Sequence, residues 1–421
     1  MHLYSVPLIF VLIGLALYAV LAGADFGAGF WQLLAGGGER GERLRDHAHN
    51  AMAPVWEANH VWLIFVLTVT WTAYPAAFGA IASTLCVPLF IAALGIIMRG
   101  AAYALRAGAE QAREQRRIDL VFAGASVLTP FALGTVIGAI ASQRVPVGNA
   151  AGDLFSSWLN PTSLMIGVLA VANSAYVAAV FLAADARRMG LDAPGERELE
   201  DSLRLRALVT GLAAGAVAAA GLVVVHSDAH FLYERLLEGA ALAAVIVSAL
   251  AGLATLALVF ARLYEIARYS AALAVAAVIA GWALAQRPVL LKGLTVQQAA
   301  APHDTLVVVI VAVLGGALIL FPSLALLFRL VLRGRLDHGG SGEPAPSVAA
   351  ADSTGLARVL AASASGLLAR IAGACLLTGF GLLTIAEAGW AHAIGLAALL
   401  GFICVGFVAI VPAQLAAEEP D

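Results

Sequence analysis

The chain has 421 residues, of which 62% are hydrophobic and only 12% are charged, and its formal net charge is −3. Soluble domains carry about 25% charged residues, so this composition excludes an ordinary soluble protein and indicates a polytopic membrane protein. The small net charge gives no reason to expect a nucleic-acid partner. Cys86, Cys375 and Cys404 stand in apolar runs without metal-ligand spacing, so we expect packing residues and no metal site.

Apolar runs of the length of a membrane-spanning helix recur along the chain and predict an all-α fold. Nine runs form a core, at residues 5–34, 51–74, 75–105, 119–142, 162–184, 205–225, 239–261, 269–286 and 305–332. The division between the seventh and eighth runs is the least distinct. Residues 335–355 are rich in Gly, Pro and Ser and predict a flexible linker. Two more runs, at 370–388 and 391–412, predict a two-helix C-terminal extension over 356–421.

The basic residues predict the orientation of these helices. If the N-terminus lies outside, the inner connections contain 19 of the 24 Lys and Arg residues and the outer connections contain four. The outer four are Arg144, Arg235, Arg287 and Lys292, and the remaining one, Arg99, lies within a helix. Because cytoplasmic connections of membrane proteins are enriched in basic residues, we expect the N-terminus outside and the C-terminus in the cytoplasm.

The second apolar run begins with an unusually polar stretch. Residues 50–62 read N-A-M-A-P-V-W-E-A-N-H-V-W, which places Glu57, Asn59, His60, Trp56 and Trp62 in a helix entering the membrane. Ionisable side chains are costly in a lipid-embedded helix, so a functional role is the first hypothesis for them. On a helix, Glu57 lies three residues and Trp56 four residues from His60, so the three share one face.

Two further charges lie in the neighbouring spans. Given the predicted orientation, Asp25, Glu57 and Arg99 come from three consecutive helices and fall in one layer near the cytoplasmic side. An unpaired buried charge is costly, so we expect Arg99 to pair with at least one of the carboxylates. For Arg99, a structural ion pair and a proton-handling site are alternative roles. A purely structural need rarely calls for two acids per base, which favours a proton-handling role for Glu57 and Asp25.

His60 and the glycines of the first span each have a simple packing interpretation. A haem or metal ligand is the alternative for His60, but a lone histidine beside Trp and Asn is more typical of a hydrogen-bonded core residue. Gly23, Gly27 and Gly29 are expected to let helices approach closely. Trp56, together with the other tryptophans of the second run, fits interfacial or core packing as well as a functional site.

These motifs resemble subunit II of the bacterial cytochrome bd-type quinol oxidases. The resemblance lies in A-D-F-G-A-G at 24–29, N-A-M-A-P-V-W-E-A-N-H-V-W-L at 50–63, W-T-A-Y-P at 71–75, Arg99, and the order of spans up to about residue 332. It implies two four-helix bundles plus a peripheral helix. The first bundle would occupy residues 1–142, and the second bundle with the peripheral helix would occupy 143–334.

The resemblance also implies a function. In such oxidases a haem-bearing subunit I of the bacterial cytoplasmic membrane carries haems b and d, oxidises quinol on the outer side and reduces oxygen to water. Subunit II resembles it in fold, binds no haem and supplies a cytoplasmic proton route. Carried over by position, Glu57, Asp25 and Arg99 would line that route, with Trp62 beside it. A structural quinone or lipid, and small single-helix accessory subunits, are further partners that the resemblance implies.

This chain departs from the family pattern at two places. Many family members carry an acid three residues before the aspartate, where this chain has Ala22, so a route through that acid would differ here. The extension after about residue 339 lies outside the family pattern.

The alternative function is a proton-coupled secondary transporter that uses Asp25 and Glu57. Transporter sites lie near the midplane of repeated halves, and the off-centre charges in the first third of this chain count against it.

Overall fold

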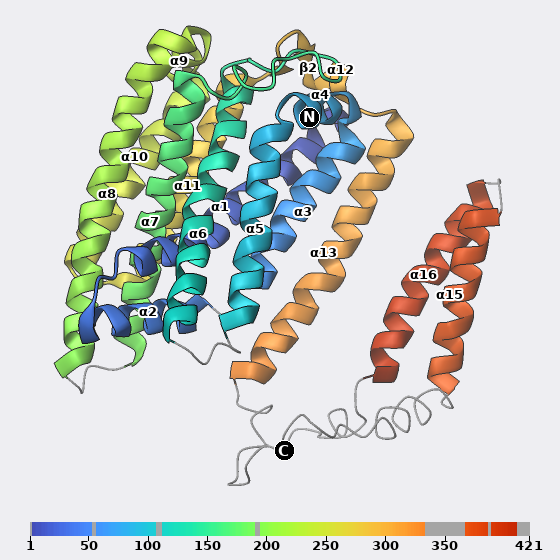
Figure 1. The fold of residues 1–421 in the computed structure, drawn as a ribbon. Coiled ribbons are helices and arrows are strands. Elements are labelled where there is room, and N and C mark those ends of the chain that lie inside the picture. The colour runs from blue at the N-terminus through green and yellow to red at the C-terminus, as the bar shows by residue number, and fades with distance from the viewer. Residues whose placement is uncertain are drawn as a thin grey trace. The chain divides into compact units, whose positions relative to one another are not determined.

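The computed structural model describes residues 2–52, 56–106, 112–189, 194–332, 367–385 and 389–410. The chain divides into two compact units, Met1–Ala325 and Leu326–Asp421. The first unit is a bundle of long helices (Figure 1). Its elements are η1 (Leu3–Ser5), α1 (Val6–Leu33), α2 (Gly38–Met52), α3 (Trp56–Ala73), α4 (Pro75–Thr84), α5 (Cys86–Arg106), α6 (Ala112–Ala141), α7 (Pro161–Met189), α8 (Pro194–Asp228), α9 (His230–Leu236), α10 (Gly239–Phe260), α11 (Tyr264–Gln286), β1 (Val289–Leu291), β2 (Leu294–Thr295), α12 (Val296–Ala299) and the larger part of α13 (His303–Leu332).

The long helices confirm an all-α polytopic membrane protein. Within the described residues, eight helices are long and apolar enough to cross a membrane, namely α1, α5, α6, α7, α8, α10, α11 and α13. The other three predicted runs appear there as shorter apolar helices, Asn59–Ala73, Arg370–Gly379 and Gly389–Phe402. The polar first turn of α3 explains why its apolar part is short.

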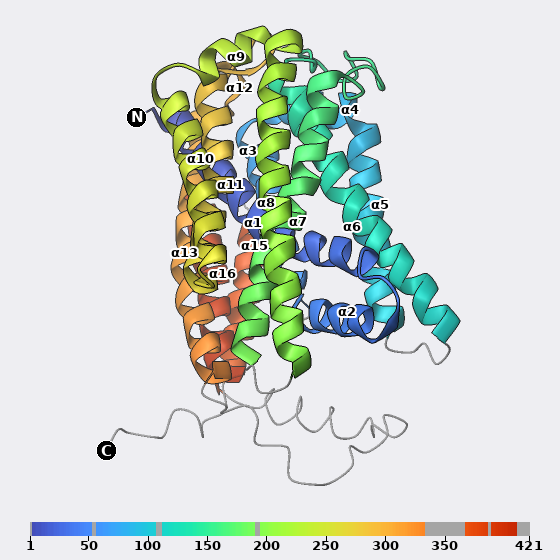
Figure 2. The same cartoon turned by 90° about the vertical axis from the view of Figure 1, so that its left-hand side faces the viewer.

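Two groups of packed helices make up the first unit (Figures 1 and 2). In the first group, α1 packs against α3 and α6, and α5 packs against α6. In the second group, α7 packs against α8 and α11, and α10 packs against α8 and α11 as well. Extensive contacts of α7 with α1 and α6 join the groups. This arrangement agrees with two bundles, whereas the expected domain boundary after residue 142 stays a prediction.

Helix α7 lies at the centre of the hydrophobic core. Residues 174–180 and 182–184 are buried on every side of the helix, which is expected only of a helix enclosed by others. The same core cluster includes Trp31 of α1, Leu203 of α8 and Tyr264 of α11. Of the helices that carry the candidate site, α1 packs directly against this central helix.

Glycine allows the close approach of α1 to its neighbours. A Cβ atom at Gly27 would overlap the backbone oxygen of Ser174 on α7, and one at Gly29 would overlap the hydroxyl of Ser126 on α6. At Gly23 a Cβ would make an ordinary contact, 3.7 Å from the Ser174 hydroxyl. The packing role predicted for these glycines is thus confirmed most clearly at Gly27 and Gly29.

Gly27→Ala is therefore expected to destabilise the bundle. Overpacking of a filled core costs about 1–3 kcal/mol or more, because the backbone of one helix must move. The control is Gly252→Ala in α10, where an added Cβ meets nothing within 4 Å. The free energy of unfolding in mixed micelles should fall for the first variant and not for the second. If both variants changed the free energy of unfolding equally, the close contact of α1 with α7 at Gly27 would not contribute to stability.

One predicted span is interrupted. The run at 75–105 is wrong as a single helix, because the structure has a break at Leu85 between α4 and α5. Pro88 lacks the N–H that a continuous helix would donate to the carbonyl of Thr84, which favours an interruption at this point. Helix α8 also begins at Pro194 rather than at residue 205, since its first turns are polar.

Elements that are not membrane spans mark the two ends of the bundle. Helix α2 is polar except for a stripe formed by Leu44, His47 and Ala48, which are buried at the spacing of one helix face. The hairpin of β1 and β2 lies at the opposite end, beside α9 and α12 (Figures 1 and 2). We call these the α2 end and the hairpin end. Neither element was predicted, because each is too short or too polar for the span pattern.

The second unit contains a helical hairpin of α15 (Leu367–Ile385) and α16 (Gly389–Ile410). Gly379 faces Leu399 closely, since an added Cβ would lie 2.6 Å from the leucine side chain. The three cysteines are free; Cys86 and Cys404 are exposed and Cys375 is half-buried, so within this chain the expected packing role has support only at Cys375. The expected linker at 335–355 lies outside the described residues.

Candidate functional site

The predicted charge layer contains a closed ion pair. Asp25 on α1 and Arg99 on α5 are 1% and 2% exposed, so both charges are removed from solvent by the protein. Arg99 Nη1 donates to Asp25 Oδ2 over 2.6 Å, and Nη2 forms a second, short contact with Oδ1. Nη2 also lies 3.1 Å from the Asp25 carbonyl oxygen. This two-pronged geometry confirms that Arg99 pairs with a carboxylate and identifies Asp25 as its partner.

Aromatic rings enclose the guanidinium. Arg99 Cζ lies 4.9 Å from the ring centre of Phe26 and 4.6 Å from that of Phe122. Its Nε has no hydrogen-bond partner within the described part of the chain. Ring faces attract a cation, and their low polarity strengthens the attraction between the two charges. The pair is therefore held rigidly, and removal of one member would leave the other without compensation.

The first turns of α3 pack directly beside this pair. Asn59 is buried, and its Nδ2 donates to the carbonyl oxygen of Leu21 on α1 over 3.2 Å. The His60 ring lies edge-on to the rings of Tyr18 and Phe26, with centre distances of 6.2 Å in both cases. Phe26 thus touches Arg99 on one side and His60 on the other. Asn59 and His60 therefore contact α1 next to the ion pair, and their role near a proton route stays a prediction.

Ala22 and Trp62 occupy the space beside the site. Ala22 is fully buried in a small cluster with Tyr18 and Phe26, and Trp62 packs against this cluster while remaining half-buried. The hydroxyl of Tyr18 has no hydrogen-bond partner within the described residues. The position at which many relatives carry an acid is therefore an apolar contact here, with one phenol as the nearest polar group of the cluster.

The structure describes the backbone position of Glu57 but not its side chain. Helix α3 begins at Trp56, so Glu57 lies in its first turn, three residues before His60 and on the same face. The side chains of Trp56 and Glu57 lie outside the described residues. The contact of Glu57 with the ion pair therefore stays a prediction, supported by the position of its helix.

His60 is half-buried, and its ring lies edge-on to two aromatic rings. Its expected role as a core residue rather than a haem or metal ligand stays a prediction. The part of the chain that the structure describes contains no group of three or more His, Cys, Asp or Glu residues that could hold a metal ion.

Charged groups near the α2 end lie beyond the ion pair. Arg106 is two turns further along α5 than Arg99, about 10 Å away along the helix axis. Its side chain contacts Asp119 of α6 at 3.1 Å and Asp46 of α2 at 3.8 Å. Burial, followed by the charge of Arg106, lowers the pKa of His49, whose ring stacks on Tyr103. These groups place charged and titratable side chains between the ion pair and the α2 end.

A second buried acid was missed by the sequence analysis. Glu200 on α8 is 1% exposed and accepts hydrogen bonds from Arg187 (3.2 Å), Arg262 (2.9 Å) and the Tyr264 hydroxyl (2.9 Å). Arg262 also contacts Asp201 at 2.6 Å, and hydrogen bonds from Asp201 and Glu200 raise its pKa. The run E-R-E-L-E-D at 196–201 was the available signal, because it contains four acids and a single arginine. The cluster ties α7, α8 and α11 together.

Comparison with known proteins gives the family of the chain. The family model for cytochrome bd terminal oxidase subunit II matches residues 3–331. The chain belongs to this family. The matched residues include Asp25, Arg99 and the first turns of α3, so the candidate site falls inside the family region. The C-terminal helices α15 and α16 fall outside it.

Individual relatives are more distant. Cytochrome bd-I ubiquinol oxidase subunit 2 of Escherichia coli K12 is 29% identical over 171 residues, covering 38% of this chain and 44% of the relative. A putative cytochrome bd menaquinol oxidase subunit II of Bacillus subtilis is 22% identical over 227 residues, covering 53% of this chain and 62% of the relative. These alignments span less than two thirds of either relative.

A solved structure supports the fold of this subunit II. A chain in the structure of bd oxidase from Geobacillus thermodenitrificans matches with a TM-score of 0.60 and 23% identity. The match covers 79% of this chain and 99% of that chain. At this identity the similarity establishes a shared fold.

Proposed function

We propose that this chain is the haem-free subunit II of a cytochrome bd-type quinol:oxygen oxidoreductase in a bacterial cytoplasmic membrane. It supports a haem-bearing subunit I and provides a cytoplasmic proton route for the reduction of oxygen to water. Family membership supports the oxidase assignment. The names of its relatives include both ubiquinol and menaquinol oxidases, so the substrate is a quinol whose ring type is open.

The buried Asp25–Arg99 pair beside α3 is the observation that carries the proton route. A structural link between α1 and α5 would need only one acid to pair with Arg99. A second acid, Glu57, lies in the first turn of α3, the helix that packs beside the ion pair. Arg99 neutralises Asp25, so the acid left over can hold and release a proton. The Arg106 group supplies polar contacts toward the α2 end.

The distribution of basic residues orients this route. The α2 end carries Arg40, Arg106, Arg187, Arg188 and Arg262, whereas the hairpin end carries the few outer cations. Basic connections face the cytoplasm, so the α2 end is the cytoplasmic side and the N-terminus lies outside. Protons would then enter near α2 and pass inward to Glu57 and the partner subunit.

The oxidase assignment is tested by purification from the native membrane through a tag on this chain. We expect a co-purifying partner and the optical bands of haems b and d. His60→Ala should leave both sets of bands at the wild-type ratio, because the chain binds no haem through this residue. His303→Ala, at an exposed position of the hairpin end, is the matched control.

Two outcomes would contradict the proposal. A colourless chain that purifies alone and transports a solute would favour the transporter instead. Loss of one haem band in an assembled His60→Ala complex, with His303→Ala unchanged, would show that this chain is a haem ligand.

A further inference from the structure

A polar pocket lies at the hairpin end, away from the candidate proton site. It has a volume of about 430 Å³ and is lined by three separate parts of the chain. These are Ser142, Gln143 and Arg144 after α6, residues 228–231 at the junction of α8 and α9, and Lys292 at the tip of the β-hairpin. Pockets of this size hold small molecules or the headgroup of a larger one.

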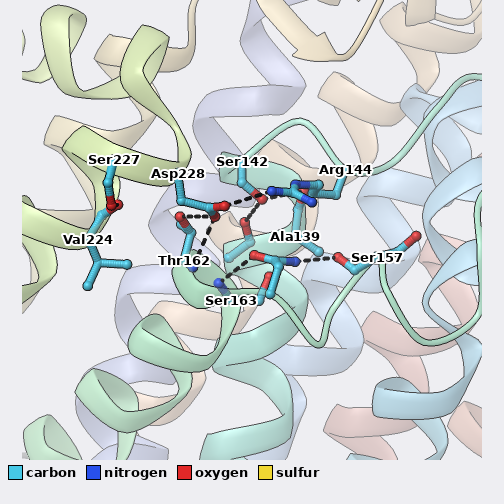
Figure 3. Close-up of polar contacts among 11 residues, drawn as sticks. Ala139, Ser142, Arg144, Ser157, Thr162, Ser163, Val224, Ser227 and Asp228 are labelled. Carbon is cyan, nitrogen blue, oxygen red and sulfur yellow. Dashed lines mark hydrogen bonds and ion pairs between the residues drawn. The ribbon is translucent and has the colours of Figure 1, made fainter.

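The carboxylate in this pocket already accepts three hydrogen bonds from the chain itself. Arg144 Nη2 donates to Asp228 Oδ1 over 2.7 Å, and Thr162 donates to Asp228 Oδ2 from both its backbone N–H (3.2 Å) and its hydroxyl (2.7 Å) (Figure 3). Asp228 is the one acid among the lining residues. Arg144 has five N–H groups, and its contact with Asp228 leaves the others available to a ligand.

Lys292 adds a cation that no acid of the described chain compensates. It is the single lysine in the sequence and is exposed, and the described residues form no ion pair with it. Leu291 and Leu294 on either side of the turn are buried, so the hairpin tip is anchored. A bridge between Pro146 and Lys292 fixes the tip to the segment that carries Arg144. Both cations therefore line one pocket.

Arg144 and Lys292 are the lining cations left for a ligand, because both ring nitrogens of His230 contact other groups of the chain. His230 lies 3.3 Å from Glu234 through Nε2 and 3.1 Å from the His226 carbonyl through Nδ1. With Asp228 paired, the pocket has more donors than acceptors and a positive charge. Phosphate oxygens accept several hydrogen bonds from such cations, with Arg the preferred partner.

The position of the pocket points to the membrane as the source of the phosphate. The apolar helices α6, α8 and α11 end at Ala141, Asp228 and Gln286, so the pocket lies where the spans leave the hydrocarbon layer. Phosphates of lipid headgroups occupy this level. We propose that Arg144 and Lys292 bind the phosphate of an anionic phospholipid headgroup in the leaflet at the hairpin end. This inference does not depend on the proposed proton route.

The single lysine allows a direct test. The protein, purified from its native membrane, is placed in nanodiscs of phosphatidylcholine with or without phosphatidylglycerol, and Lys292 acetylation is followed by mass spectrometry of its peptide. Phosphatidylglycerol should slow acetylation about fivefold, the effect of a basic residue engaged at an anionic surface. Arg144→Gln should abolish most of this protection, whereas Arg287→Gln, a matched charge removal outside the pocket, should leave it intact.

A second readout covers the case in which Arg144→Gln disturbs the fold. Lys292→Gln removes an exposed side chain, and native mass spectrometry should show about fivefold less retained phosphatidylglycerol, with Lys292→Arg restoring it. Equal protection by inorganic phosphate alone would overturn the lipid source. Equal acetylation in both lipids, or equal effects of Arg287→Gln and Arg144→Gln, would overturn the site, since only diffuse attraction would then remain.

Discussion

Arg99→Leu is expected to cost about 3–5 kcal/mol of stability, because it leaves the Asp25 carboxylate buried without a partner. Both groups are almost fully enclosed, and the rings of Phe26 and Phe122 lie against the guanidinium. An effect of this size should lower the yield of assembled complex and its thermal unfolding midpoint. Measurement of both in the same membrane preparation separates loss of folding from loss of activity.

An exposed ion pair provides the matched control. Arg188 and Glu265 lie 2.6 Å apart but are 61% and 51% exposed, so Arg188→Leu should cost less than about 1 kcal/mol. The double variant Asp25→Asn with Arg99→Leu should recover part of the loss, since no unpaired charge remains. If Arg99→Leu were as mild as Arg188→Leu, the buried pair would not be an important stabilising contact.

Glu57→Gln is expected to lower quinol oxidase turnover by at least about tenfold, because a positioned proton-transfer group contributes roughly 10²–10⁴-fold to a rate. Glutamine keeps the size and much of the hydrogen bonding of glutamate but cannot release a proton. Haem content should stay at the wild-type level, and Glu57→Asp should retain much of the activity. Oxygen consumption per haem measures the effect.

Glu114→Gln is the control for this change. Glu114 lies in the first turn of α6 and is exposed, so its neutralisation should leave turnover unchanged. A Glu57→Gln complex that assembled and turned over at the rate of the Glu114→Gln complex would remove the proton role. Glu57 would then be a structural partner of the Asp25–Arg99 pair.

The sequence was most informative where a single residue conflicted with its surroundings. Arg99 and Asp25 stand out because lipid-embedded helices rarely carry charge, and the cost of burial required them to meet. The spans were equally clear, because about twenty apolar residues in a row are needed to cross a membrane. Both features depend on local composition, and both are seen in the structure.

Features that depend on distant contacts were missed. Glu200 and Arg262 look like ordinary polar residues at helix ends, and the packing of α8 on α10 brings them together. The pocket around Arg144 and Lys292 joins segments almost 150 residues apart, which no local pattern predicts. Helix α2 was missed because its apolar stripe is short and its remaining residues resemble a charged connection.

The most direct test of the central claim is proton uptake during a single turnover. Fully reduced complex is mixed with oxygen while a pH-sensitive dye reports uptake from solution and the haem bands report oxidation. In Glu57→Gln, uptake should be slowed at least about tenfold with haem content unchanged, while Glu57→Asp takes up protons at close to the wild-type rate. Uptake at the wild-type rate in Glu57→Gln would contradict a proton route through this subunit.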